Sequence, residues 1–96
     1  MYALSFDMDI SSLKVYYGEQ YNSAYYEIKQ TILKRGFRWI QGSTYMLESN
    51  DMSVLFGTIN DLRSILWFAK SVRDIRGYKV EDWSDFTKEV KRDIKY

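Results

Sequence analysis

The 96-residue chain contains no histidine and no cysteine. Without cysteine it has neither a disulfide framework nor a thiolate metal ligand, and its composition fits a reducing compartment. Without histidine, acid–base or metal-assisted chemistry has to rest on carboxylates, hydroxyls and guanidinium groups. The chain also lacks a run of about 18 apolar residues and a cationic segment followed by an apolar one. We therefore expect a soluble, cytoplasmic protein with no membrane partner.

Strong net charge is absent as well. Lysine and arginine number 14 against 13 acidic residues, which gives a formal net charge of +1. No global field then attracts nucleic acid, so a site for RNA has to be a local patch. Aromatic residues, by contrast, make up 18% of the chain. A single domain of residues 1–96 cannot bury them all, so we expect some in a subunit interface or on a binding surface.

The chain opens on a strand signal. Tyr2, Leu4, Phe6 and Met8 share one parity and would fill one face of a strand, whereas Asp7 points to the other face. A carboxylate near the end of a buried strand costs free energy unless a cation, a hydrogen-bond donor or water meets it. Asp7 is therefore the first candidate for a functional residue.

Helix and strand signals alternate along the rest of the chain. Residues 10–19 are polar with one glycine and predict a loop. Two apolar stripes at helical spacing predict helices, and short runs of strand formers predict three more strands. The stripes are Tyr21, Tyr25, Ile28 and Ile32, closed by Gly36, and then Leu55, Ile59, Leu62 and Leu66. The strands are residues 37–40, 43–47 and 72–80, and a last helix carries Phe86, Val90 and Ile94.

This order, β-α-β-β-α-β with a C-terminal helical extension, is typical of an α+β, ferredoxin-like sandwich with both helices on one face. In its usual strand order, 4-1-3-2, the first strand is central. Its C-terminal end then lies beside the starts of the third and fourth strands, which brings together Asp7, Ser43 and Arg73. The open face and the aromatic surplus predict a homodimer, whose two-fold axis would bring both copies of Asp7 together.

Short segments in order along nearly the whole chain match one family. They are residues 1–3, 6–7, 21–22, 24–25, 36–37, 41–43 with Tyr45, 71–76 and 83–87. On these segments the chain resembles the virulence-associated protein D family, small bacterial ribonucleases related in fold to the small CRISPR-associated nuclease subunit. The resemblance implies a homodimeric, modified ferredoxin-like fold and endoribonuclease activity. In some members this activity belongs to a toxin–antitoxin pair, so an antitoxin protein is an expected partner. The resemblance also implies that Asp7, ending the first strand, is an active-site residue in each protomer.

Two roles are open for Asp7. The two carboxylates of a dimer can share one Mg²⁺ ion through water, or, without metal, form an acid–base pair. The alternative is an aspartate that caps a backbone turn, which is the role we expect for Asp9 at residues 11–12. Ser43 could bond to a phosphate oxygen or support Asp7, or be a simple turn hydroxyl. Covalent serine catalysis is rejected because no histidine can act as base.

Basic and aromatic residues near this edge are the candidates for RNA contacts. Guanidinium groups suit phosphate, so we expect at least one of Arg73 and Arg76 to contact RNA, unless both pair with neighbouring carboxylates such as Asp74. Their odd spacing predicts that only one of them faces the site. Tyr45, beside the predicted turn, is the tyrosine that could stack on a base. The other tyrosines are expected in the core or in a dimer contact.

Two functions from different classes remain open at this point. The first is an endoribonuclease that cleaves RNA phosphodiester bonds. The second is a non-catalytic dimeric module that binds nucleic acid or another protein, because a fold alone does not confer an activity. Asp7→Asn separates them, since an enzyme loses cleavage and keeps binding, whereas a binding module changes little.

Overall fold

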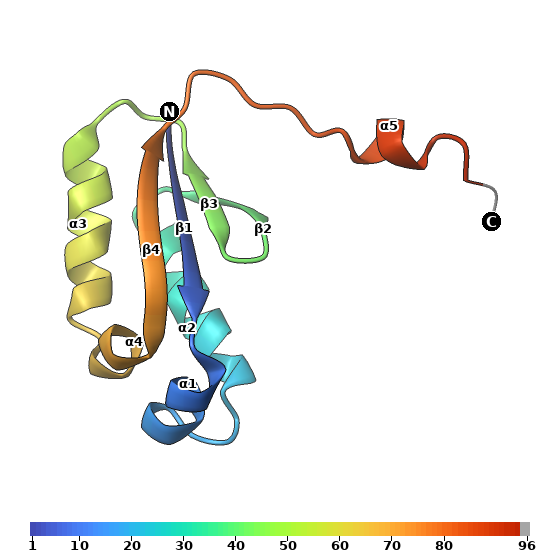
Figure 1. Cartoon of the computed structure of the whole chain (residues 1–96). Coiled ribbons are helices and arrows are strands. Elements are labelled where there is room, and N and C mark those ends of the chain that lie inside the picture. The colour runs from blue at the N-terminus through green and yellow to red at the C-terminus, as the bar shows by residue number, and fades with distance from the viewer. Residues whose placement is uncertain (95–96) are drawn as a thin grey trace.

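A computed structural model describes residues 1–94 of the chain. The elements are β1 (Tyr2–Met8), α1 (Ile10–Tyr16), α2 (Asn22–Leu33), β2 (Arg38–Gln41), β3 (Thr44–Leu47), α3 (Met52–Arg63), α4 (Leu66–Ser71), β4 (Val72–Lys79) and α5 (Thr87–Lys91). The four strands form one antiparallel sheet in the order β2-β3-β1-β4 (Figure 1). The expected α+β, ferredoxin-like fold with the first strand central is confirmed.

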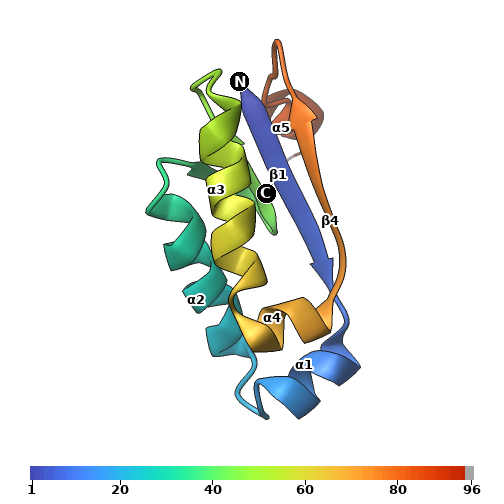
Figure 2. The ribbon, with the colours of Figure 1, turned by 90° about the vertical axis from the view of Figure 1, so that its left-hand side faces the viewer.

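The hydrophobic core lies between the sheet and the two long helices, α2 and α3, which cover the same face (Figure 2). The alternation of β1 sends Leu4, Phe6 and their same-parity neighbours toward these helices, and Leu4 is fully buried. Ile28 of α2 and Leu62 of α3 meet them with at most 1% of their surface exposed. Each such side chain contributes roughly 1.5–3 kcal/mol on burial. In the part of the chain that the structure describes, no helix covers the opposite face of the sheet.

Local signals account for several helix and strand ends. Asp51 caps α3, because its carboxylate accepts a hydrogen bond from the backbone N–H of Ser53 at 2.9 Å. Gly36, after α2, has a φ of +93°, and Gly42, in the turn between β2 and β3, has a φ of +46°. Both backbone conformations favour glycine, as expected for a helix end and a tight turn.

The first segment predicted as a loop is instead a short helix. Asp9 does cap the following residues, as expected, accepting from Ser11 N at 3.2 Å and from the Ser12 hydroxyl at 2.9 Å. The chain then continues into α1, which packs against α4 and fully buries Leu13. The prediction of a loop over residues 10–19 is therefore wrong for residues 10–16.

The second long helix is also shorter than the apolar stripe predicted. Ile65 is extended, with φ −87° and ψ 101°, so α3 ends before it and α4 starts after it. Leu66, predicted to lie on the buried stripe, is 67% exposed. Phe68 is buried in its place and meets the ring of Phe6 edge-on, with centroids 5.7 Å apart. Packing of this ring in the core outweighs continuation of the helix.

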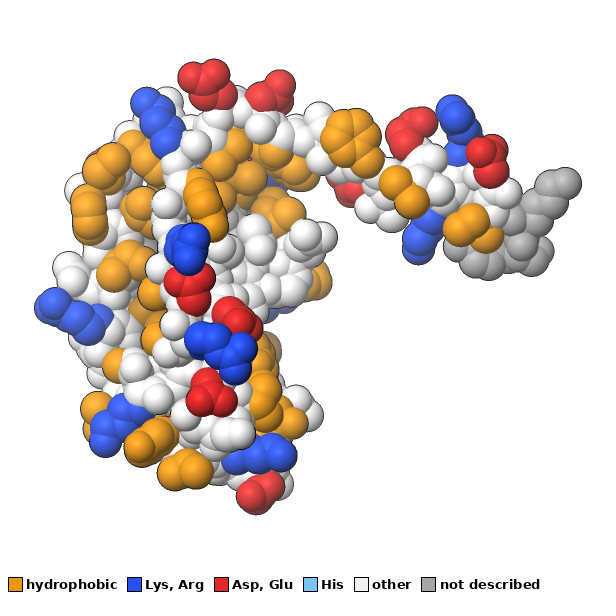
Figure 3. All heavy atoms as spheres, viewed as in Figure 1, with side chains coloured by type: hydrophobic (Ala, Val, Ile, Leu, Met, Phe, Trp, Pro, Cys, Tyr) orange, Lys and Arg blue, Asp and Glu red, His pale blue; other side chains and the backbone are white. Residues whose placement is uncertain are grey.

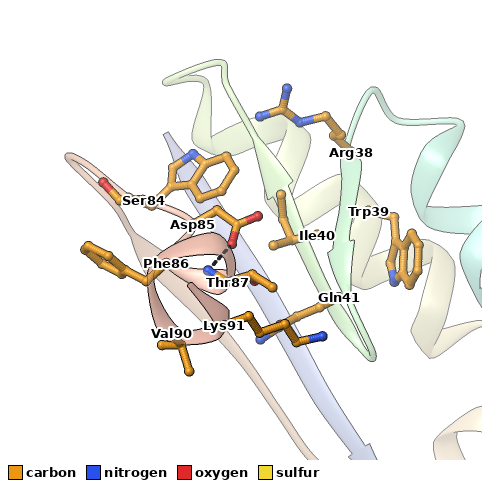
Figure 4. A pocket seen from close by; sticks show the side chains of 11 residues that line it. Arg38, Trp39, Ile40, Gln41, Ser84, Asp85, Phe86, Thr87, Val90 and Lys91 are labelled. Carbon is orange, nitrogen blue, oxygen red and sulfur yellow. Dashed lines mark hydrogen bonds between the residues drawn. The ribbon is translucent and has the colours of Figure 1, made fainter. Parts of the chain in front are cut away.

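The chain beyond β4 leaves the body of the molecule as an extended segment, residues 81–94, which we name the C-terminal arm (Figure 1). The predicted last helix is present as α5, preceded by a hydrogen bond from Thr87 N to Asp85 at 2.9 Å. The apolar side chains in and beside α5, Phe86, Val90 and Ile94, are 65%, 78% and 52% exposed. A groove of about 670 Å³ separates the arm from β2 (Figure 4).

Within residues 1–94, no helix has the length and the apolar character needed to cross a membrane.

Candidate active site

Asp7 lies near the end of the central strand, on the face of the sheet without helices. Its side chain is 64% exposed. On one side it faces Asp74 of β4 in the register of the sheet. On the other side, the turn after β2 lies next to the end of β1, because Phe6 N donates a hydrogen bond to the Ser43 carbonyl at 3.2 Å. The end of β1, the start of β4 and this turn therefore meet at one edge, as the topology predicted.

Arg73 bridges the carboxylates of Asp7 and Asp9 at this edge. One of its terminal nitrogens lies 3.4 Å from Asp7 Oδ2 and the other lies 4.0 Å from Asp9 Oδ1. The guanidinium group is 64% exposed, so water and ligands reach it. Arg73 thus has two carboxylate contacts within its own chain and retains donors for a further anion.

A β-bulge places Arg73 on this face. Asp7 pairs with Asp74, whereas the next residue, Met8, pairs with Val72, so Arg73 is an extra residue in β4. Arg76 lies on the same face and pairs with Asp74, its Nε 3.0 Å from the carboxylate. The expectation that only one of the two arginines faces the site is therefore wrong. Figure 3 shows the resulting row of alternating basic and acidic side chains over β1 and β4.

Two titratable groups near Asp7 are shifted by their surroundings. The hydrogen bond from the Ser12 hydroxyl is the main cause that lowers the pKa of Asp9, helped by Ser11 N and by the charge of Arg73. Burial raises the pKa of Tyr25 in α2, and the charges of Asp7 and Tyr21 raise it further. Tyr25 therefore lies within electrostatic reach of Asp7. The sequence pattern placed Tyr25 on the apolar stripe of the first long helix and did not predict this proximity.

Two other predicted site residues are placed differently. Tyr45 is only 3% exposed, and its ring stacks on Phe6 in the core at 6.3 Å. The expectation that Tyr45 stacks on RNA is corrected, because neither the position nor the burial of the ring leaves room for a base. Ser43 lies in the turn before β3, and within residues 1–94 its hydroxyl makes no hydrogen bond to Asp7.

A metal ion would find few ligands in one chain. Within residues 1–94, no group of three or more acidic side chains is placed to hold one ion. Asp7 offers one exposed carboxylate, and Mg²⁺ is often held by one or two carboxylates with water in its remaining positions. Asp7 from two copies would fit that requirement.

Known proteins resemble the chain over nearly its full length. No model of a protein family matches the sequence. It is 52% identical over 91 residues to Endoribonuclease VapD of Dichelobacter nodosus, covering 95% of this chain and 98% of the relative. It is 53% identical over 93 residues to Endoribonuclease VapD of Helicobacter pylori, covering 95% and 99%. Endoribonuclease VapD 1 of Riemerella anatipestifer is 54% identical over 85 residues, covering 88% and 96%. With such identity over almost the whole of each protein, the chain belongs to the VapD family.

Proposed function

We propose that the chain is an endoribonuclease that works as a homodimer, with Asp7 of both copies at the centre of the active site. The relatives named as endoribonucleases match it from end to end. The observation that supports Asp7 is its exposed carboxylate on the open face, held beside the guanidinium of Arg73. The substrate is RNA, and the proposal places the enzyme in the cytoplasm, where that substrate is found.

The chemistry assigned to this centre follows from the groups present. Asp7 accepts a proton from the attacking oxygen, either water or the RNA 2′-hydroxyl, or orients that oxygen by a hydrogen bond. As the attacking oxygen bonds to phosphorus, the P–O bond to the leaving oxygen breaks, and the leaving oxygen takes a proton from water. Arg73 turns from Asp7 to a phosphate oxygen and stabilises the negative charge that develops there. This reorientation of the Arg73 side chain costs little free energy, because the exposed ion pair that it breaks is worth at most about 1 kcal/mol. A Mg²⁺ ion held by the two Asp7 carboxylates would add Lewis-acid stabilisation of the phosphoryl oxygens.

Ser43 is left out of this centre because, in the part of the chain that the structure describes, its hydroxyl makes no hydrogen bond to Asp7 or Arg73. Arg76 is kept as a second phosphate contact, because it lies on the open face next to Arg73. Its partner Asp74 holds it through an exposed ion pair, with side chains 66% and 50% exposed.

The dimer is supported by apolar surface that one chain leaves uncovered. The C-terminal arm buries no residue of α5, and three apolar side chains on it are more than half exposed. No helix among the described residues covers the sheet face that carries Asp7 (Figure 2). A second copy would cover both. An antitoxin protein remains a predicted partner for apolar surface that the dimer leaves free.

Asp7→Asn tests the proposal, because asparagine keeps the shape of the side chain and removes its charge. A mixed RNA pool is incubated with wild type and variant, with and without chelator, and the new RNA ends are identified. We expect the variant to lose at least a hundredfold in cleavage rate while binding RNA normally. Asp82→Asn, an exposed aspartate on the arm, is the matched control. Undiminished cleavage by Asp7→Asn would favour the binding-module alternative, and light scattering at the mass of one chain would contradict the dimer.

A further inference from the structure

A row of aromatic and cationic side chains runs along one side of α2. Tyr21, Tyr25 and Lys29 are four residues apart, so they lie one above the other on the same helix face, and all three are half-buried. At one end, Lys14 Nζ of α1 lies 5.7 Å from the centre of the Tyr21 ring. At the other end, Lys29 Nζ lies 4.2 Å from the centre of the Trp39 ring. We name these five residues the α2 track.

Trp39 is the most accessible ring of the track. It lies on the edge strand β2 and is 47% exposed. Its indole N–H donates to the Gly42 carbonyl at 2.8 Å, which fixes the ring against the turn after β2. Figure 4 shows the indole on the side of β2 that faces away from α5, and Trp39 is one of the residues that line the groove along the arm. An aromatic ring that is exposed, oriented and accompanied by a cation is well suited to stacking on a nucleic acid base.

The track leads to the proposed active site. The turn that holds the Trp39 ring also gives its Ser43 carbonyl to Phe6 N, one residue before Asp7. In the middle of the track, Tyr25 is close enough to Asp7 for the carboxylate charge to raise its pKa further, after burial. A strand bound along α2 would therefore come near the end of β1. It would reach the Asp7 carboxylate around that end, because Asp7 and Trp39 lie on opposite faces of the sheet.

The two lysines of the track pair with no acidic side chain of the described residues. Within residues 1–94, no carboxylate lies within ion-pair distance of Lys14 or Lys29, whereas Arg73 and Arg76 both pair with aspartates. A purely structural explanation, in which the rings only complete the core, accounts for the partial burial of Tyr21 and Tyr25 but not for the exposed Trp39. Unpaired lysines beside rings suit a ligand that carries both bases and phosphates.

We propose that the α2 track holds the substrate as single-stranded RNA, with one base stacked on Trp39 and neighbouring phosphates on Lys29 and Lys14. This inference rests on the proposed endoribonuclease function and names the form of its substrate. Duplex RNA does not fit, because its bases are already stacked on each other and show a protein only their edges.

The test measures binding of a short fluorescent RNA to Asp7→Asn, which separates binding from cleavage. The RNA is used single-stranded and annealed to its complement. Trp39→Leu is expected to weaken binding of the single strand roughly five- to a hundredfold, and Trp39→Phe, which keeps a ring, to restore most of it. Phe56→Leu is the control, since Phe56 is 60% exposed but lies on α3 beside the opposite edge strand.

Salt dependence tests the cations. Lys29→Gln is expected to lower the slope of log affinity against log salt by about 0.7, the value for one phosphate contact on a single strand. Lys34→Gln, an exposed lysine at the end of the same helix, should leave the slope unchanged. Melting temperatures of all variants show whether a loss is a loss of fold.

Three outcomes overturn the inference: duplex bound as tightly as the single strand, Trp39→Leu binding within twofold of Phe56→Leu, or an unchanged salt slope in Lys29→Gln. Cleavage that persists in Asp7→Asn is a different failure, because it removes the proposed centre. In that case the track is tested with Asp7 intact, by comparing the KM values of Trp39→Leu and Phe56→Leu.

Discussion

Replacing Arg73 by alanine separates two roles of the arginine at the end of β1. In the first role Arg73 contacts the phosphate of the substrate, and in the second it only neutralises Asp7 and Asp9 of its own chain. The structure shows the intramolecular contacts, at 3.4 and 4.0 Å. The question is whether they are the whole function of the residue.

The size of the expected effects makes the distinction possible. Both side chains of the Arg73–Asp7 pair are 64% exposed, so the pair contributes only about 0.2–1 kcal/mol to folding. In a domain of this size, 1 kcal/mol corresponds to roughly 4–8 °C in melting temperature, and the variant should lose no more than that. A charge that stabilises the transition state is worth far more, about a hundred- to a thousandfold in rate.

The assay is initial cleavage rate per folded protein, with the folded fraction taken from the melting curve of the same preparation. We expect Arg73→Ala to lose at least a hundredfold, and Arg73→Lys to recover part of it, because lysine keeps the charge but not the two-pronged geometry. Arg92→Ala is the matched control, since Arg92 pairs with Glu89 at the same 3.4 Å and is similarly exposed. A rate within twofold of wild type, together with a lower melting temperature, would refute the phosphate role.

Two further predictions concern stability. The side-chain and backbone hydrogen bonds from Ser53 lower the pKa of Asp51 below its ordinary 3.8, so its contribution is complete above that pH and disappears as the pH falls through the lower folded value. Asn caps helices about as well as Asp, so Asp51→Asn should keep the melting temperature at neutral pH. The melting temperature of the variant should fall less in acid than that of the wild type. An equal fall in acid would contradict this prediction. Gly77 faces α3, where an added Cβ would lie 3.2 Å from Leu55 Cδ2. Gly77→Val should therefore destabilise the fold by about 1–3 kcal/mol in denaturant unfolding, and no change would show that the packing there is loose.

The fold could be predicted where the signal was local and periodic. Alternation along β1 and the stripes on α2 and α3 each repeat several times, so the faces they predicted are the buried ones. The short helices could not be predicted in this way. In α1 only Leu13 is buried, and one residue makes no stripe. The break at Ile65 carries no proline or glycine and follows from the packing of Phe68 against Phe6.

The site could be predicted to the level of the sheet edge but not of individual side chains. Strand order alone brings Asp7 and Arg73 together, and the structure shows them in contact. Strict alternation, however, would place Arg73 and Arg76 on opposite faces of the sheet. The bulge beside Asp7 places both on the same face. A bulge adds one residue to one strand and leaves no clear mark in the sequence.

Tyr45 and Trp39 show why the strand order decides which aromatic ring can meet RNA. The two residues face each other in the register of β2 and β3, so both side chains point to the same face of the sheet. β3 is an inner strand, and Tyr45 is buried beneath the helices, whereas β2 is an edge strand and its Trp39 is 47% exposed. From the sequence, Tyr45 stood out because it follows the predicted turn. In the sheet, its cross-strand neighbour Trp39 has the exposed position instead, and the indole N–H of Trp39 donates to Gly42 of the same turn. Proximity to a site is therefore not sufficient for a stacking residue, which also needs a position that no other layer of the fold covers.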